Sequence, residues 1–153
     1  MNCHVIGILL LPMKSADSSS AHSIKYSPSK AIDNDKETIF ATSGYYEMNP
    51  WLQIQLGNIS SVHHVIIHNR NDCCGDRMKN VTLRVAFTKF VKGMNLNDAE
   101  ICGTYRGPGK NGDEISISCN GSIKGQYVSI HLMQDTPALL NLNEIMIYGI
   151  EGK

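Results

Sequence analysis

Hydrophobic and polar residues alternate along most of the chain. The pattern is plainest where Leu52, Ile54 and Leu56 share one face of an extended segment and glutamines occupy the other. Because successive side chains of a β-strand point to opposite faces, this period of two predicts strands with one buried face. The segments that show it, or that are apolar runs of strand length, are residues 51–56, 65–68, 81–88, 115–119, 127–132 and 144–148.

Residues that favour turns separate these segments. No stretch keeps an amphipathic helical period over three turns, and no internal repeat is present. Many short strands joined by turns predict a single all-β domain, an antiparallel sandwich or barrel. A chain of 153 residues is long enough for one such domain. The turn signals are Asn49-Pro50, Gly57-Asn58, Gly107-Pro108-Gly109, Asn111-Gly112 and Asn120-Gly121.

The N-terminus resembles a secretory signal. Val5–Leu11 is apolar but too short to span a bilayer, and the small residues Ala16 and Ala21 follow as candidate cleavage points. The segment before it has no Lys or Arg, so a misassigned start or a short buried strand is the alternative. Residues 14–23 are polar and rich in serine, which is typical of a flexible leader.

These features divide the chain at residue 23. We expect residues 1–23 to be signal peptide and flexible leader, and residues 24–153 to be the folded domain. Removal of Cys3 with the signal would leave an even number of cysteines, as two disulfides require. Glycosylation sequons also favour an extracellular, secreted protein; they begin at Asn58, Asn80 and Asn120.

Charge and motif content argue against several classes of function. The 14 Lys and Arg residues balance 14 Asp and Glu, and no basic stripe is present, so we expect no nucleic-acid partner. No Ser/His/Asp or Cys/His arrangement and no Cys-x-x-Cys motif points to an enzyme. His63 and His64 are adjacent on a predicted strand, where they should point to opposite faces and not share a zinc ion.

The richest chemistry lies in the stretch from Arg70 to Arg77, directly after a predicted apolar strand. A bridge between the adjacent Cys73 and Cys74 would form a strained ring, because neighbouring Cα atoms lie only about 3.8 Å apart. Such a ring offers a rigid apolar surface on which a sugar can pack. The two arginines offer forked donors for vicinal hydroxyls, and Asp72 can hold one guanidinium in place.

The residues alone leave two other interpretations of this stretch open. The stretch could be an ordinary solvated loop at the end of the domain. The two cysteines could also pair separately with Cys102 and Cys119, since four cysteines permit three connectivities.

The run Arg70-x-Asp72-Cys-Cys-x-x-Arg77 resembles the sugar-binding signature of F-type (fucose-binding) lectin domains, and the similarity extends from about Ala31 to Gly149. The resemblance implies a discoidin-like jelly-roll β-sandwich with binding loops at one end. It also implies that both arginines donate to fucose and that the Cys73–Cys74 disulfide packs on the sugar.

Two departures from the signature concern the site and its bridges. The histidine that begins the signature is replaced by Ser43, and nearby Tyr45 and Tyr46 could supply stacking or a substitute hydroxyl. One family disulfide is missing, because Ala41 and Asn143 stand at its two positions. The resemblance implies that the remaining bridge joins Cys102 to Cys119.

The resemblance also implies a structural calcium ion at the acidic turn that follows Lys30. The expected ligands are the side chains of Asp33 and Glu144 with the carbonyls of Lys30, Asp35 and Phe40. Hard oxygen ligands of this kind suit Ca²⁺. Without the resemblance, the residues would be interpreted as an ordinary acidic turn.

We therefore expect a secreted, non-catalytic lectin of innate defence or cell recognition, with fucosylated glycans as partners and no transmembrane segment. A single shallow sugar site binds weakly, so a homo-oligomer would supply avidity. The alternative is a discoidin-like module that has lost fucose binding through Ser43 and contacts a protein or phospholipid surface.

Overall fold

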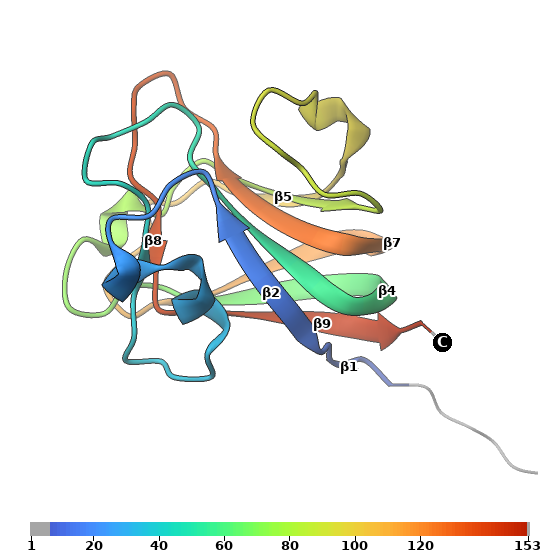
Figure 1. Ribbon diagram of the computed structural model, residues 1–153. Helices are drawn as coiled ribbons and strands as arrows, with labels where there is room; N and C mark the ends of the chain where they lie inside the picture. The colour runs from blue at the N-terminus through green and yellow to red at the C-terminus, as the bar shows by residue number, and fades with distance from the viewer. Residues whose placement is uncertain (1–6, 153) are drawn as a thin grey trace, which may run out of the picture.

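The computed structural model describes residues 7–152, and strands are the main regular secondary structure in this range (Figure 1). Single turns of 3-10 helix, labelled η, lie in the connecting loops. Within the described range, no helix is long and apolar enough to cross a membrane. In chain order the elements are β1 (Leu9–Leu10), β2 (Met13–Ser18), η1 (Ile24–Tyr26), η2 (Pro28–Ile32), β3 (Phe40–Ala41), β4 (Trp51–His68), η3 (Gly75–Arg77), β5 (Val81–Ala86), η4 (Leu96–Asp98), β6 (Glu100–Tyr105), β7 (Glu114–Leu132), β8 (Asn141–Leu142) and β9 (Glu144–Glu151).

The strands form a seven-stranded sheet and a two-stranded sheet, and every pairing between described strands is antiparallel. The large sheet has the order β1-β9-β4-β7-β5-β6, with β2 paired to β4 off this path, and β3 pairs with β8. Strands β4 and β7 are 18 and 19 residues long. Register shifts between Gln55 and Ser60 and between Val62 and His64 bend them, because bulges bend and twist a strand. The predicted antiparallel all-β fold is confirmed.

The predicted alternation defines the core. Leu52, Ile54 and Leu56 are fully buried on β4. Six apolar positions of the two other alternating segments are buried as well, and they are Val81, Leu83, Val85, Val128, Ile130 and Leu132. One face of each strand therefore packs inward, as a period of two requires.

Two sequence expectations need correction. The Gly57-Asn58 and Asn120-Gly121 pairs do not end strands but lie within β4 and β7, so segments expected to be separate are continuous. Both pairs lie at irregular places in the ladder, where turn-forming residues bend a strand. Phe87, expected to continue the buried face of its strand, follows the end of β5 and is 59% exposed.

The segment expected to be a flexible leader differs most from expectation. Met13–Ser18 form β2, which runs antiparallel to β4 (Figure 1). Leu11, just before it, is 2% exposed, and its amide donates to the carbonyl of Ile147 at 2.8 Å. A strand is held by its backbone ladder, which serine-rich side chains do not prevent. Neither β1, whose Leu9 and Leu10 are exposed, nor the half-buried β2 is the short buried strand of the alternative.

The expected signal peptide begins in residues 1–6, which lie outside the described residues, and its cleavage stays a prediction. Cleavage after Ala16 or Ala21 would remove all or most of β2 from the sheet.

Candidate functional site

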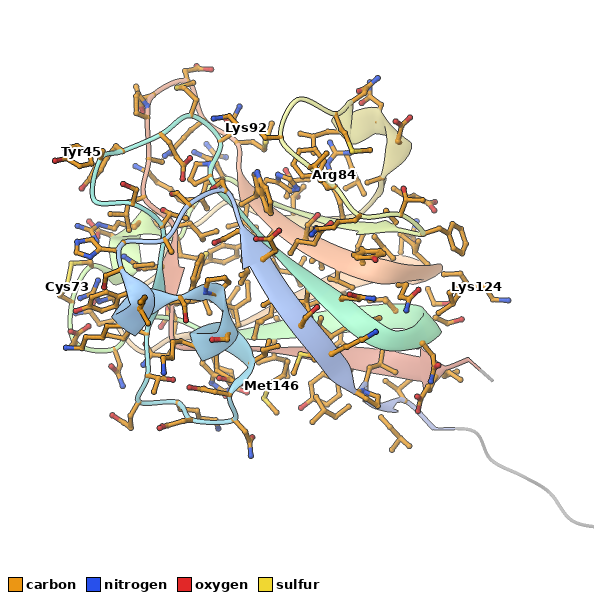
Figure 2. All side chains as sticks on the ribbon, in the orientation of Figure 1. Tyr45, Cys73, Arg84, Lys92, Lys124 and Met146 are labelled. Atoms are coloured by element: carbon orange, nitrogen blue, oxygen red, sulfur yellow. A yellow bond between two sulfur atoms is a disulfide. The ribbon has the colours of Figure 1, made fainter. Side chains whose placement is uncertain are left out.

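The loop that follows β4 lies at the end of the sandwich opposite Lys124 (Figure 2). Its first residue, Asn69, is buried, and its side-chain Nδ2 donates to the carbonyls of Gly75 and Lys110, each at 2.9 Å. The amide of Gly75 donates to Asn111 Oδ1 at 2.8 Å. Any side chain at Gly75 would clash, because a Cβ there would lie 2.5 Å from the Asn111 backbone nitrogen. The loop is therefore fixed against the turn that precedes β7.

Both disulfides implied by the family resemblance are confirmed. Cys73 and Cys74 form a bridge within the loop, with their Cα atoms 3.7 Å apart. Cys74 has a φ of 64°, a left-handed conformation that turns the chain sharply at this point. The second bridge joins Cys102 on β6 to Cys119 on β7. The alternative connectivities are excluded.

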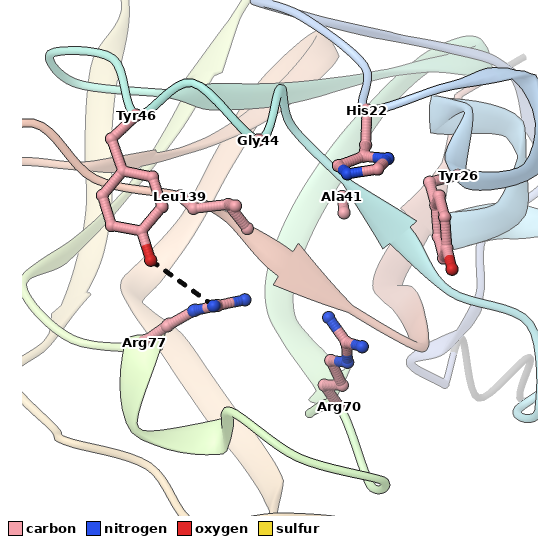
Figure 3. A pocket seen from close by; sticks show the side chains of 8 residues that line it. All are labelled: His22, Tyr26, Ala41, Gly44, Tyr46, Arg70, Arg77 and Leu139. Carbon is pink, nitrogen blue, oxygen red and sulfur yellow. Dashed lines mark hydrogen bonds between the residues drawn. The ribbon is translucent and has the colours of Figure 1, made fainter.

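A cavity of about 370 Å³ opens beside this loop (Figure 3). Arg70 and Arg77 line it from the loop, and Leu139 lines it from the segment before β8. The residues that line it from the N-terminal half of the chain are His22, Tyr26, Ala41, Gly44 and Tyr46. Four separate chain segments thus meet at one hollow.

The two arginines are held by different partners. Arg70 Nε donates to Asp72 Oδ1 at 2.7 Å, and Nη2 donates to the other carboxylate oxygen at 3.3 Å. The hydrogen bond from Arg70 lowers the pKa of the Asp72 carboxyl below its ordinary value. Arg77 Nη2 donates to the Tyr46 hydroxyl at 3.4 Å, and the guanidinium lies 6.0 Å from the centre of that ring. These contacts orient both guanidinium groups at the wall of the cavity.

The other residues expected at the site lie around the cavity rather than on its wall. Ser43 Oγ accepts from the Tyr45 amide at 3.2 Å, and Tyr45 itself is 90% exposed. Neither residue lines the cavity, and the same holds for Asp72 and the half-buried Cys73 and Cys74. Their direct contact with a sugar stays a prediction.

Sequence reasoning missed five residues of this wall, and the two with polar side chains among them are His22 and Tyr26. They belong to the polar stretch taken for a leader and to the turn η1 directly after it. Their rings pack edge to face, with centres 5.2 Å apart at 84°. The signal available was slight: a histidine and a tyrosine in a segment without periodicity.

The acidic turn gathers oxygen atoms around the hydroxyl of Thr38. Thr38 Oγ1 lies 2.6 Å from Asp33 Oδ2, 3.0 Å from the Asp35 carbonyl oxygen and 3.3 Å from the Lys30 carbonyl oxygen. A hydroxyl has one proton and cannot donate to three acceptors at once. Thr38, which the sequence reasoning did not single out, therefore completes a cluster of oxygens with three of the expected calcium ligands.

Glu144 reaches the same turn from β9. Its side chain is 3% exposed, and Oε2 accepts from the Asn34 amide at 3.2 Å. Oε1 is buried without a hydrogen-bond partner among the described residues. Burial raises the pKa of this carboxyl to about 8. An orphaned buried carboxylate oxygen beside an oxygen cluster fits a hard divalent cation.

The remaining expected ligand is the carbonyl of Phe40. Phe40 lies in β3 opposite Leu142, and its side chain is fully buried. Its carbonyl stays a predicted ligand.

Asn143 lies next to Glu144 and links the two candidate sites. Its Nδ2 donates to the Lys36 carbonyl in the acidic turn, and its Oδ1 accepts from the Asn71 amide in the disulfide loop at 3.1 Å.

The adjacent histidines do not point apart as expected. His63 Nδ1 and His64 Nδ1 lie 2.8 Å apart, because the register shift between Val62 and His64 interrupts the alternation. The His64 ring stacks on Tyr148 with ring centres 4.8 Å apart. Within residues 7–152, no three His, Cys, Asp or Glu side chains are grouped to hold a metal ion. The pair therefore lacks the third ligand of a zinc site.

Comparison with known proteins decides the family. Residues 30–130 match the family of NedA-like galactose-binding domains of the F5/F8 type C group. The chain belongs to this family. A fucolectin from the eel Anguilla anguilla is 25% identical over 138 residues, covering 88% of this chain and 84% of the relative. A pentraxin fusion protein from Xenopus laevis is 28% identical over 103 residues, covering 67% of this chain and 23% of the relative.

Solved structures agree on the fold. An F-lectin from striped bass (Morone saxatilis) serum superposes with a TM-score of 0.78 at 23% identity, covering 90% of this chain and 47% of that one. A family 32 carbohydrate-binding module of C. perfringens NanJ, solved with galactose, gives 0.75 at 16% identity, covering 92% and 98%. The predicted discoidin-like β-sandwich and the resemblance to F-type lectins are thereby confirmed.

Proposed function

We propose that this domain is a lectin that binds a terminal sugar of the fucose type in the cavity beside the disulfide loop. The observation that carries the proposal is the placement of Arg70 and Arg77 on the wall of one hollow. The match to fucolectins and to modules solved with sugars supports a carbohydrate ligand.

Recognition would rest on forked donors and an apolar wall. A guanidinium presents several N–H groups in a fixed plane, which suits neighbouring sugar hydroxyls. Hydrogen bonds from a charged donor are stronger than neutral ones. Ala41, Leu139 and the ring of Tyr26 offer apolar surface for the C–H face of a sugar. No carboxylate, cysteine or hydroxyl nucleophile other than tyrosine is among these lining residues, which favours binding over catalysis.

We further propose a structural calcium ion at the acidic turn. Asp33, Glu144 and Thr38 would hold it through their side chains, together with the carbonyls of Lys30 and Asp35. The ion would neutralise the buried Glu144 carboxylate. Because Asn143 hydrogen-bonds to both the turn and the disulfide loop, an ordered turn would also steady the sugar site.

An extracellular location is part of the proposal. Two disulfides are typical of proteins in oxidising compartments, and the striped bass F-lectin comes from serum. Fucosylated glycans of cell surfaces or microbes would be the partners, in cell recognition or innate defence. Binding at a shallow site would gain avidity from a homo-oligomer.

A glycan array with and without Ca²⁺ tests the proposal, followed by calorimetry with L-fucose. Arg70→Ala and Arg77→Ala should each weaken binding by about ten- to a hundredfold, since a hydrogen bond from a charged group contributes about 1.5–3 kcal/mol. Arg106→Ala is the matched control, because Arg106 lines a different hollow beside β5 and β6. Silence on the array, with binding to phospholipid vesicles instead, would favour the discoidin-like interaction module.

A further inference from the structure

Residue 43 does not supply a side chain to the cavity. Its hydroxyl oxygen is occupied by the Tyr45 amide, and its backbone amide donates to Ser20 Oγ at 2.8 Å. The first contact ties the Ser43 side chain to its own loop, and the second ties its backbone to the N-terminal segment. Any polar contact that this side of the hollow makes with a ligand therefore comes from a residue other than Ser43.

The N-terminal segment crosses the same loop and is tied to it by hydrogen bonds. The Ser19 amide donates to the Trp51 carbonyl at 3.0 Å, at the start of β4. The His22 amide donates to the carbonyl of Ala41 at 2.9 Å, at the end of β3. Together with the Ser20 contact to Ser43, these bonds fix the segment on two strands that end at the cavity. His22 therefore has a defined position.

The imidazole of His22 lies directly above Gly44. A Cβ added to Gly44 would approach ring atoms Cδ2 and Nε2 to 3.2 Å, so glycine leaves the room that the ring occupies. The edge-to-face contact with Tyr26 steadies the ring from its other side. Figure 3 shows His22 across the cavity from Arg77, with the arginines below it. The side chain remains exposed, so a ligand can reach it.

We propose that His22 is a sugar-binding residue, which supplies from the N-terminal segment a hydrogen-bonding group that position 43 lacks. An imidazole offers one donor and one acceptor nitrogen when neutral and two donors when charged. A pyranose in the cavity would then be held between His22 on one wall and the two guanidinium groups on the other. The inference rests on the proposed sugar function and adds a residue that belongs to a different chain segment.

The test is calorimetry of the full chain with L-fucose. His22→Ala should weaken binding by about two- to tenfold, because a neutral hydrogen bond contributes about 0.5–1.5 kcal/mol. His22→Gln, which retains a donor and an acceptor, should lose less. His63→Ala is the matched histidine control, because His63 lies on β4 outside the cavity lining. A second measurement follows the imidazole NMR signals, where L-fucose should shift those of His22 and leave those of His63 unchanged.

The possible outcomes separate the two proposals. If His22→Ala binds L-fucose like the wild type while Arg77→Ala binds weakly, the sugar site stands and the role of His22 is overturned. If the wild-type chain does not bind L-fucose at all, both proposals fall. Should His22→Ala fold poorly, His22→Gln and the NMR shifts of the wild type still decide the matter.

Discussion

The disulfide loop and the N-terminal segment face each other across one cavity, yet they are held there by different means. Asn69–Arg77 is fixed by a covalent bridge, a buried asparagine and a glycine with no room for a side chain. Ser19–Tyr26 is fixed by backbone hydrogen bonds to β3 and β4 and by the pairing of β2. Side-chain chemistry leaves a motif in the sequence, whereas backbone pairing leaves almost none. The same site therefore has one half that a motif reveals and one half that it does not.

The largest expected effect tests whether the N-terminal segment belongs to the fold. Leu11→Ala should lower the free energy of unfolding by about 2–5 kcal/mol, the usual cost of truncating a buried leucine. Leu9→Ala is the matched control, because Leu9 is 70% exposed on β1, and it should change little. Urea unfolding of both variants measures the difference. Equal stability of the two variants would show that this segment is cleaved or unpaired in the mature protein.

The comparison explains how much the sequence could predict. Alternation at Leu52, Ile54 and Leu56 predicted buried strands, because that signal is local and repeats every two residues. Arg70 and Arg77 were found because a disulfide motif lies between them. These features can be recognised in the sequence without the three-dimensional structure.

Other features depend on contacts between residues distant in the chain and could not be predicted from the sequence. His22 reaches the cavity because Gly44, which is distant in the sequence, leaves room for its ring. Thr38 joins the oxygen cluster because the fold brings its hydroxyl to the Asp33 carboxylate and two carbonyls. β4 continues through Gly57-Asn58 because β2 and β7 pair with it before these residues, β7 and β9 pair with it after them, and the Gly57 amide donates to the Pro12 carbonyl. Tertiary contacts thus overrode the local turn signal.

A second prediction concerns His131, which is buried on the sheet away from the exposed walls of the cavity. His131 is 1% exposed on β7, and burial, with a smaller contribution from the Arg84 charge, lowers its pKa to about 4. Because the unfolded chain binds the proton near pH 6.5, the stability that neutral His131 contributes is present above pH 6.5 and is lost as the pH falls through 4. The shift corresponds to about 3 kcal/mol. Urea unfolding at pH 7 and pH 4 measures it.

His131→Asn should reduce this dependence on pH. Ser129 Oγ lies 3.0 Å from His131 Nε2, so the asparagine variant also loses a buried hydrogen bond, and the slope with pH is the informative quantity. The interpretation would be contradicted by the same slope in the wild type and in His131→Asn.

The third prediction tests whether a calcium ion at the acidic turn stabilises the fold. Removal of Ca²⁺ by EDTA should lower the melting temperature, because an ion that binds only the folded state stabilises it by mass action. At a hundredfold excess over Kd the loss amounts to about 2.7 kcal/mol. Thr38→Val should show a smaller response, since it keeps the shape of the side chain and removes its oxygen. Superimposable melting curves with EDTA and with millimolar Ca²⁺ would remove the ion from the account.

The smallest expected effect on sugar binding concerns Tyr46, which also lines the cavity. Its hydroxyl accepts from Arg77 Nη2 at 3.4 Å, near the long limit for a hydrogen bond, so Tyr46→Phe should weaken L-fucose binding by about twofold. Tyr45→Phe is the matched control, since Tyr45 lies outside the cavity lining and is almost fully exposed. The ring of Tyr46 retains its contact with the Arg77 guanidinium in the phenylalanine variant. A tenfold loss on Tyr46→Phe would mean that the hydroxyl touches the sugar itself, and the tyrosine would then join His22 and the arginines as a direct ligand.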